Sequence, residues 1–365
     1  PGTNNTYTWF RNGSIYASTP TLTLTESGNY YCEVTNSVVT PAISMILITG
    51  NVNAQLEIVP DSEDVNALVD LYNNTNGPNW INQSGWLGPD PLTWYGVTFD
   101  NNGKVIGLDL SNNNLEGTFP VEITQLDQLE ELYLGNNSLS GTVPASISNL
   151  LNLRVLFAQF NQLEGTLPVE IGLLTSLEIL DLSDNNFTGD LPSSFSDLSN
   201  LTQLFLSFNQ FTGNLPANMG TLPLNNIAIS FNQFSDISNL TGVTGYQLFA
   251  ENNNLEFDDF EAIFSVEAPQ SYIISPQNTP QTLLSGTQGG SLVLDASIGG
   301  SVNNYQWYKD GVLLNGEMDP QFIISTFDSD STGLYSCEIT NDNVTATYGL
   351  TIYRDFQVIE YLPVS

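Results

Sequence analysis

One motif constrains this chain more than any other feature: a segment of the form L-x-x-L-x-L-x-x-N-x-L-x-G-x-L-P recurs every 24 residues between Val105 and Leu224. The five regular copies begin at Val105, Leu129, Leu153, Leu177 and Leu201. A fixed period of this length indicates units that cannot bury their apolar face alone. This stretch must therefore fold into stacked coils that share one continuous core.

The second copy shows what each motif position does. Leu132 and Leu134 alternate with polar residues, which predicts a short strand with one buried face. Asn137 follows at a bend, where its side chain can both donate to and accept from backbone groups. Gly141 permits a tight turn and Pro144 fixes φ where the chain starts back. The same bend holds Asn113, Asn161, Asn185, Asn209, Asn232 and Asn253, which predicts an asparagine ladder.

This spacing is typical of a leucine-rich repeat solenoid, an α/β fold with short parallel strands and an irregular or helical convex side. The sixth and seventh copies start at Leu224 and Gly245, so the last two steps between copies are shortened to 23 and 21 residues. The apolar run from Leu255 to Phe264 then predicts an amphipathic closing segment. We therefore expect about seven repeats over residues 105–264.

Composition limits the partners. The 365 residues suggest two or three domains, and 39 acidic residues against 5 basic ones give a net charge of −34. Such a field repels nucleic acid and anionic lipid, so we expect neither partner. No apolar run reaches the length of a membrane span, so we expect no membrane insertion.

Two further segments share a different pattern. Trp9 is followed by Tyr30 and Cys32, and Trp307 is followed by Tyr335 and Cys337. A Trp on one strand and a Tyr two residues before a Cys on a later strand resemble strands C and F of immunoglobulin-like sandwiches. The second copy adds strands B, E and G at residues 291–296, 321–324 and 345–353, whereas the first copy lacks strands A and B. No cysteine on strand B faces Cys337, so we expect a buried free thiol.

Residues 61–104 predict an N-terminal cap. A helical apolar pattern joins Val65, Leu68 and Tyr72 behind capping residues at 61–62, and three tryptophans follow at positions 80, 86 and 94. The segment from Thr93 to Asp100, together with the repeats, resembles plant-type leucine-rich repeat receptors. Thr93 and Phe99 stand where that family usually has disulfide-bonded cysteines. The resemblance therefore favours the cysteine-free variant of large bacterial surface proteins.

The predicted organisation is a partial immunoglobulin-like domain (1–49), a linker (50–60), the cap (61–104), the solenoid (105–264), an immunoglobulin-like all-β domain (265–353) and a second linker (354–365). Leu56-Glu57 to Ser62 is similar to Ile359-Glu360 to Ser365. We expect from this similarity a longer tandem array in which another cap follows residue 365.

The chain has no histidine, which excludes Ser-His-Asp and Cys-His nucleophile systems. No nucleotide-binding glycine motif occurs in a strand-to-helix context, so we expect no enzymatic activity and no cofactor. Carboxylates at Asp258, Asp259, Asp328 and Asp330 could hold structural calcium, although a solvated acidic edge explains them better.

Ligand binding is predicted on the concave strands, where the motif leaves outward positions free. Phenylalanines at the fifth and eighth positions would form an apolar stripe bordered by acids, and soluble proteins rarely expose such a patch without a partner. The predicted binding residues are Glu131, Tyr133, Phe157, Phe160, Asp181, Asp184, Phe205, Phe208, Phe231, Phe249 and Glu251. Alternatively, Phe160, Phe208 and Phe231 fold into the asparagine bend and fill it.

Two functions follow from these patterns. The first is a non-enzymatic extracellular or cell-surface adhesion module that binds a glycan or a protein on the concave face. The second is a structural spacer or fibre subunit, in which neighbouring copies of the chain complete the broken sandwich head to tail by strand addition.

Overall fold

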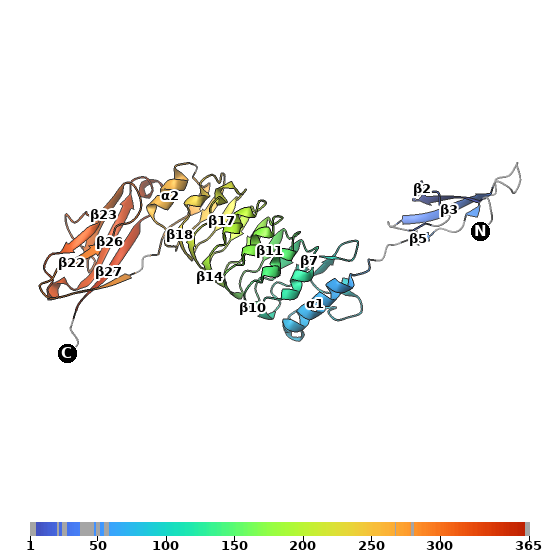
Figure 1. The fold of residues 1–365 in the computed structure, drawn as a ribbon, viewed down its shortest axis with the longest axis horizontal. Helices are drawn as coiled ribbons and strands as arrows, with labels where there is room; N and C mark the ends of the chain where they lie inside the picture. The colour runs from blue at the N-terminus through green and yellow to red at the C-terminus, as the bar shows by residue number, and fades with distance from the viewer. Residues whose placement is uncertain are drawn as a thin grey trace. The chain divides into compact units, whose positions relative to one another are not determined.

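The computed structural model describes residues 5–19, 22–23, 28–36, 47–48, 52–54, 58–266, 268–278 and 281–361 (Figure 1). These residues fall into two compact units, one made mainly of residues 1–59 and the other mainly of residues 60–365. Part of the similarity between residues 56–62 and 359–365 lies outside the described residues.

The first unit is one antiparallel sheet. Its strands are β1 (Asn5–Arg11), β2 (Ser14–Ala17), β3 (Gly28–Asn36), β4 (Leu47–Ile48) and β5 (Val52–Ala54). Strand β3 pairs with β1 so that Trp9 lies opposite Cys32. Tyr30 and Cys32 are buried.

The second unit begins with the predicted cap. Helix α1 (Ser62–Asn74) starts at the N-cap Asp61, whose carboxylate accepts hydrogen bonds from the amides of Glu63 and Asp64. The buried Asp64 carboxylate accepts from the amide of Val105 at 2.8 Å and from Lys104 Nζ at 3.1 Å, which ties the cap to the first coil. The 3₁₀ segments η1 (Gly77–Asn79) and η2 (Pro91–Thr93) follow. Trp80, Trp86 and Trp94 are buried in one core with α1 and the leucines of the first coil.

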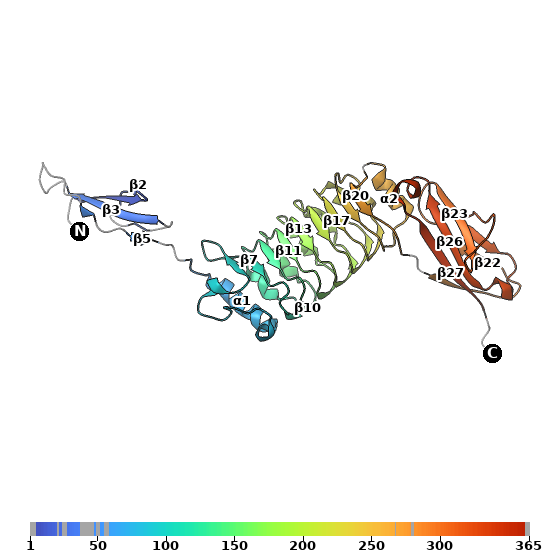
Figure 2. The same ribbon diagram turned by 180° about the vertical axis from the view of Figure 1, so that it is seen from behind.

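The coils stack between α1 and α2 (Figures 1 and 2). Each contributes one strand to a nine-stranded sheet, here called the long sheet, which is parallel except for the pair β6–β7. Its strands are β6 (Val97–Phe99), β7 (Val105–Asp109), β9 (Glu131–Tyr133), β11 (Val155–Phe157), β13 (Ile179–Asp181), β15 (Gln203–Phe205), β17 (Asn226–Ala228), β19 (Gln247–Phe249) and β20 (Ser271–Ile273). The long sheet carries the predicted concave face.

A second, six-stranded sheet runs along the coils, here called the short sheet. Its strands are β8 (Glu116–Thr118), β10 (Ser138–Gly141), β12 (Gln162–Gly165), β14 (Asn186–Asp190), β16 (Gln210–Asn214) and β18 (Gln233–Asp236). Short 3₁₀ helices complete the coils: η3 (Val121–Gln125), η4 (Ala145–Asn149), η5 (Val169–Leu173), η6 (Ser193–Asp197), η7 (Met219–Thr221) and η8 (Ser238–Leu240). The motif leucines are buried between these layers as one contiguous core.

The predicted asparagine ladder is confirmed. Asn209 is typical: its amide donates to the carbonyls of Leu182 and Leu206 at 2.9 and 3.1 Å, and its oxygen accepts from the amide of Phe187 at 3.0 Å. Each side chain therefore satisfies backbone groups of its own coil and of the preceding one. The ladder ends on Gln277, whose amide donates to the carbonyls of Ala250 and Ile274.

The solenoid is longer than predicted. Strand β20 pairs in parallel with β19, and Gln277 takes the ladder position of an eighth coil. The predicted end at residue 264 is therefore wrong. The predicted closing segment is the helix α2 (Phe257–Phe264), which lies between β19 and β20 in the chain and packs its apolar residues against the core.

The C-terminal residues form two further sheets. The larger one has the order β21 (Gln281–Gly286), β27 (Ile352–Glu360), β26 (Gly333–Asn341), β23 (Asn303–Lys309) and β24 (Val312–Leu313). The smaller pairs β22 (Leu292–Asp295) with β25 (Gln321–Ile324). The short 3₁₀ helix η9 (Ser329–Ser331) precedes β26. Cys337 is buried outside any disulfide, as predicted, and burial raises the pKa of its thiol to about 12.

The last strand lies further along the chain than predicted. Residues 345–348 form the short helix α3 (Thr345–Tyr348), and Gly349 then adopts the left-handed conformation at its end. Strand β27 (Ile352–Glu360) follows and pairs with both β26 and β21. Residues 354–360 therefore belong to a sheet, and the predicted linker at 354–365 is wrong over that part.

Candidate ligand-binding face

The long sheet aligns the fifth motif position of every coil into one row. The strand register places Asp109, Tyr133, Phe157, Asp181, Phe205, Ala228, Phe249 and Ile273 side by side, in that order. The rings of Tyr133 and Phe157 contact each other with centroids 5.4 Å apart. Phe157, Phe205 and Phe249 are half-buried, because neighbouring side chains of the row cover their flanks.

The eighth motif position forms a second row at the end of the strands, here called the left-handed row. Its members Asn112, Asn136, Phe160, Asp184, Phe208, Phe231 and Asn252 all have φ between 53° and 57°. Asparagine and aspartate tolerate this conformation, whereas a bulky residue there is strained. Three of the seven coils nevertheless place phenylalanine at this position.

The left-handed phenylalanines point outward. Phe160, Phe208 and Phe231 are 52%, 49% and 40% exposed, and the Phe208 and Phe231 rings stack with centroids 4.3 Å apart. The alternative prediction that they fill the asparagine bend is wrong, because the positive φ turns each side chain away from the core. The three coils therefore present exposed aromatic rings on a backbone conformation that is strained for phenylalanine.

Main-chain hydrogen bonds hold the left-handed row in register. The amide of Phe160 donates to the carbonyl of Ser183 at 3.0 Å, and that of Asp184 to Ser207 at 2.9 Å. The amide of Phe208 repeats this bond with Ser230 at 2.9 Å. Neighbouring side chains of the row are therefore about one strand spacing, ~4.8 Å, apart.

Two carboxylates interrupt the aromatic rows in the same coil. Burial raises the pKa of Asp181, although its carboxylate accepts a hydrogen bond from the amide of Ser183 at 2.9 Å. Burial, and then the negative charge of Asp181, raise the pKa of Asp184. Partly dehydrated acids beside apolar rings are poised to bind a group of opposite charge.

The remaining predicted residues lie toward the ends of this surface. The Tyr133 hydroxyl donates to Glu131 at 3.2 Å, and burial with the Glu131 charge raises the pKa of Tyr133. Glu251 accepts from the Ser230 hydroxyl at 2.7 Å. These two acids therefore have internal partners, and the phenylalanines with Asp181 and Asp184 form the centre of the candidate face.

The predicted calcium candidates do not assemble into a metal site. Within the described ranges, no group of three or more Asp, Glu or Cys side chains is arranged to hold a metal ion. Asp328 instead accepts from the Ser331 hydroxyl at 2.9 Å as the cap of η9.

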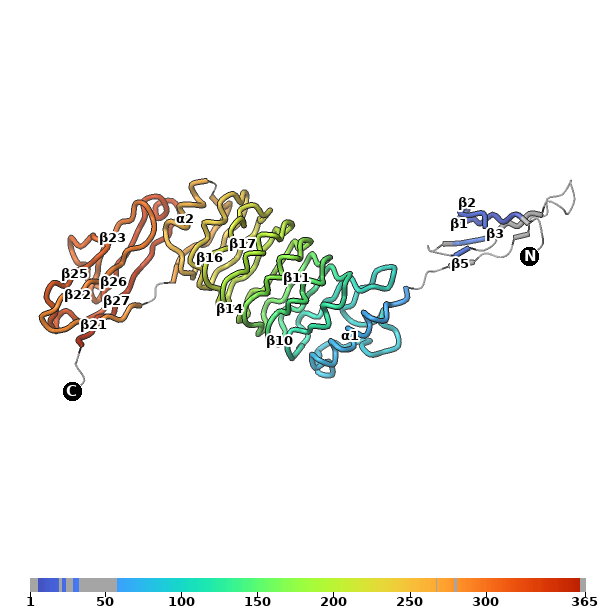
Figure 3. Tube along the Cα trace, viewed as in Figure 1, coloured from blue at the N-terminus to red at the C-terminus, as the bar shows by residue number. Residues whose placement is uncertain are grey.

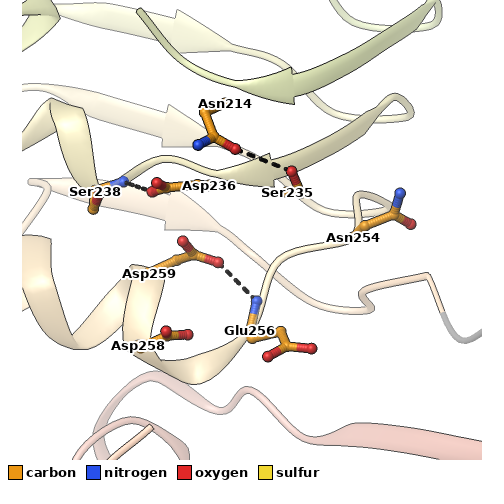
Figure 4. A pocket seen from close by; sticks show the side chains of 8 residues that line it. All are labelled: Asn214, Ser235, Asp236, Ser238, Asn254, Glu256, Asp258 and Asp259. Carbon is orange, nitrogen blue, oxygen red and sulfur yellow. Dashed lines mark hydrogen bonds between the residues drawn. The ribbon is translucent and has the colours of Figure 1, made fainter. Parts of the chain in front are cut away.

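Asp258 and Asp259 line a cavity of about 390 Å³ at the end of the solenoid (Figure 4). The cavity is lined by Asn214, Ser235, Asp236, Ser238, Asn254, Glu256, Asp258 and Asp259. Desolvation, together with a hydrogen bond to the Asp236 carboxyl group, raises the pKa of Asp259 to about 8. The pKa of Asp236 is lowered despite its burial, because Ser238 and Asp259 donate hydrogen bonds to its carboxylate, so Asp259 is the member of the pair that holds a proton more readily.

Stability should respond to this proton. The pKa of Asp259 is 3.8 in the unfolded chain and about 8 in the folded protein, so the folded protein holds the proton more tightly. The resulting contribution to the free energy of unfolding is full below about pH 4 and is lost as the pH rises toward 8. Replacing Asp259 with Asn keeps both an acceptor for the Glu256 amide and a donor for Asp236. Relative to Asp259→Asn, the wild type should lose about 1.4 kcal/mol of unfolding free energy per pH unit between those values.

Urea unfolding at a series of pH values measures this difference. Asp258→Asn is the matched control, because Asp258 lies on the same helix but is exposed. It should follow the wild-type curve. Parallel curves for the wild type and Asp259→Asn would show that Asp259 is ionised in the folded protein.

Comparisons with known proteins support the repeat assignment. The family described as "Leucine rich repeat" matches residues 104–163 and 170–211. The chain is similar to "Receptor-like protein kinase BRI1-like 3" of Arabidopsis thaliana, with 42% identity over 84 residues, which cover 20% of this chain and 7% of that protein. A probable leucine-rich repeat receptor-like protein kinase of the same plant is 36% identical over 77 residues, covering 20% of this chain and 8% of that protein. The chain thus spans less than a tenth of the length of these relatives.

Two of the solved structures to which the chain is similar are plant proteins. The BIR3–SERK2 complex of Arabidopsis thaliana includes a chain that is 32% identical, with 43% of this chain and 87% of that chain covered and a TM-score of 0.41. A plant ice-binding protein is 20% identical, and the match covers 61% of this chain and 89% of that protein with a TM-score of 0.43. The family match over residues 104–163 and 170–211 confirms the prediction of leucine-rich repeats, whereas the resemblance to bacterial surface proteins stays a prediction.

Proposed function

We propose that this chain is a non-enzymatic extracellular recognition module that holds a protein or glycan ligand against the long sheet. The observation that carries the proposal is the left-handed row, where Phe160, Phe208 and Phe231 are exposed on strained backbone. Folding alone favours asparagine at these positions, so a retained function explains the aromatic side chains better. No described helix combines the length and apolarity needed to cross a membrane.

The proposal is tested by probing a glycan array and an array of extracellular proteins with the intact chain. Binding should be lost after Phe157, Phe205 and Phe208 are replaced with Ser, since these side chains lie on two adjoining rows. The matched control replaces Val169 and Leu173, which are 57% and 56% exposed on η5, with Ser. A chain that binds neither array, or binds equally well after the first set of substitutions, would contradict the proposal.

We also infer that the C-terminal strands form an immunoglobulin-like sandwich. Trp307 is fully buried and lies opposite Cys337 in the pairing of β23 with β26. The Tyr335 hydroxyl donates to the carbonyl of Ser331 at 3.1 Å, the bond expected of a tyrosine corner. The first unit repeats the register, with Trp9 opposite Cys32.

A second candidate function is a spacer or fibre subunit of a tandem array. It is favoured by one feature of the first unit: its described strands β1 to β5 form a single sheet, which would be one half of an immunoglobulin-like sandwich. Strands from a neighbouring chain could complete that sandwich by edge pairing. Size measurement over a wide concentration range tests this candidate, and a monomer at every concentration would remove it.

A further inference from the structure

The centre of the long sheet brings aromatic rings around two acids. Asp181 lies between Phe157 and Phe205 in the fifth-position row, as the pairing of β13 with its neighbours requires. Asp184 lies between Phe160 and Phe208 in the left-handed row. The six side chains, here called the cation cage, belong to three consecutive coils.

The spacing of the cation cage suits one inserted side chain. Phe160 and Phe208 are two strand spacings apart, roughly 10 Å, with Asp184 in the coil between them. Both rings are about half exposed, and Phe231 stacks against one face of Phe208, which leaves its other face for a ligand. Aromatic faces attract cations, and a carboxylate below them strengthens that attraction.

The acids of the cage have no counter-charge within the described protein. Neither Asp181 nor Asp184 forms an ion pair with a described residue, and burial raises the pKa of both. The chain has only five basic residues, and each interacts elsewhere: Arg11, Lys104, Arg154, Lys309 and Arg354. A complementary charge must therefore come from a ligand.

We propose that the cation cage binds an arginine or lysine side chain of an extended peptide segment of a partner protein. This inference rests on the proposed function and selects, from its two ligand classes, the cationic peptide. A neutral sugar leaves both carboxylates without a counter-charge, and an acidic sugar is repelled. In the third-position row, Gln203 lies in the last coil of the cage, and Asn226 and Gln247 lie in the two coils beyond it. Their amide groups can bond the main chain of a peptide that extends in that direction.

The test selects binders to the intact chain from a displayed library of random linear peptides. Enriched peptides should share an arginine or lysine next to apolar residues. Their affinity, measured by titration calorimetry, should fall at least about tenfold in Asp181→Asn and Asp184→Asn. Replacement of the enriched arginine with citrulline should cause a similar loss.

Asparagine at position 184 keeps the left-handed backbone, as Asn112 and Asn136 do in other coils, so Asp184→Asn should fold normally. Glu164→Gln is the matched control, because Glu164 is exposed on the short sheet and should leave peptide affinity unchanged. Binders without a shared cation, or with equal affinity for Asp184→Asn, overturn the inference but leave the proposed function standing. A peptide library that yields no binder also overturns the inference. The proposed function is decided separately, by the glycan and protein arrays probed with the wild type and with the variant in which Phe157, Phe205 and Phe208 are Ser.

Discussion

Replacing Phe160, Phe208 and Phe231 together with Asn is expected to abolish ligand binding while leaving the fold as stable as before, or more stable. The three residues have φ of 54°, 57° and 55°, and relief of this strain contributes about 1 kcal/mol for each side chain. Loss of the Phe208–Phe231 stack costs about 1 kcal/mol and offsets part of the gain. The net change should therefore lie between zero and about 2 kcal/mol of added stability.

Thermal or urea unfolding of the triple variant, run beside the two arrays, measures both effects. Asn112, Asn136 and Asn252 already occupy this position in other coils, so the substitutions introduce no new backbone requirement. A fall in stability of more than about 2 kcal/mol would mean that the phenylalanines are structural, because exposed rings on strained backbone cannot contribute that much.

Replacing Asn209 with Ala is expected to destabilise the solenoid by roughly 1–3 kcal/mol, the cost of one buried polar group left without a partner. The substitution leaves the Phe187 amide without its acceptor. It also removes one of two donors from the Leu182 and Leu206 carbonyls, which keep their bonds from Asn185 and Asn232. All three groups are buried between coils, so water cannot replace the lost side chain.

Urea unfolding checks this value, with Asn186→Ala as the matched control. Asn186 is exposed on β14, so its loss should change stability by less than about 0.5 kcal/mol. Because each coil contacts only its neighbours, hydrogen exchange should show the opening of Asn209→Ala centred on the coils that contain β14 and β16. A loss below about 1 kcal/mol would contradict the structural role assigned to the ladder.

The end of the solenoid illustrates what the repeat pattern could not reach. The eighth coil has Gln277 in place of the ladder asparagine, and its strand β20 has a serine and a tyrosine where the regular copies have other residues. The glutamine side chain forms the same kinds of hydrogen bond as the asparagine, so the ladder continues although the sequence no longer matches the repeat motif. Likewise, α3 replaces the start of the predicted final strand, because the pairing of β27 is set by distant residues of β21 and β26.

The sequence by itself determined the period, the ladder, the buried leucines, the cap with its tryptophans and the identity of the outward positions, because these depend on local spacing repeated along the chain. Only the tertiary structure decided which outward side chains are accessible. It half-buries Phe157 and Phe205, exposes Phe160 and Phe208, and sets Asp181 and Asp184 between them. That arrangement depends on the backbone φ at each bend and on the register between coils, and both follow from hydrogen bonds between residues far apart in the sequence.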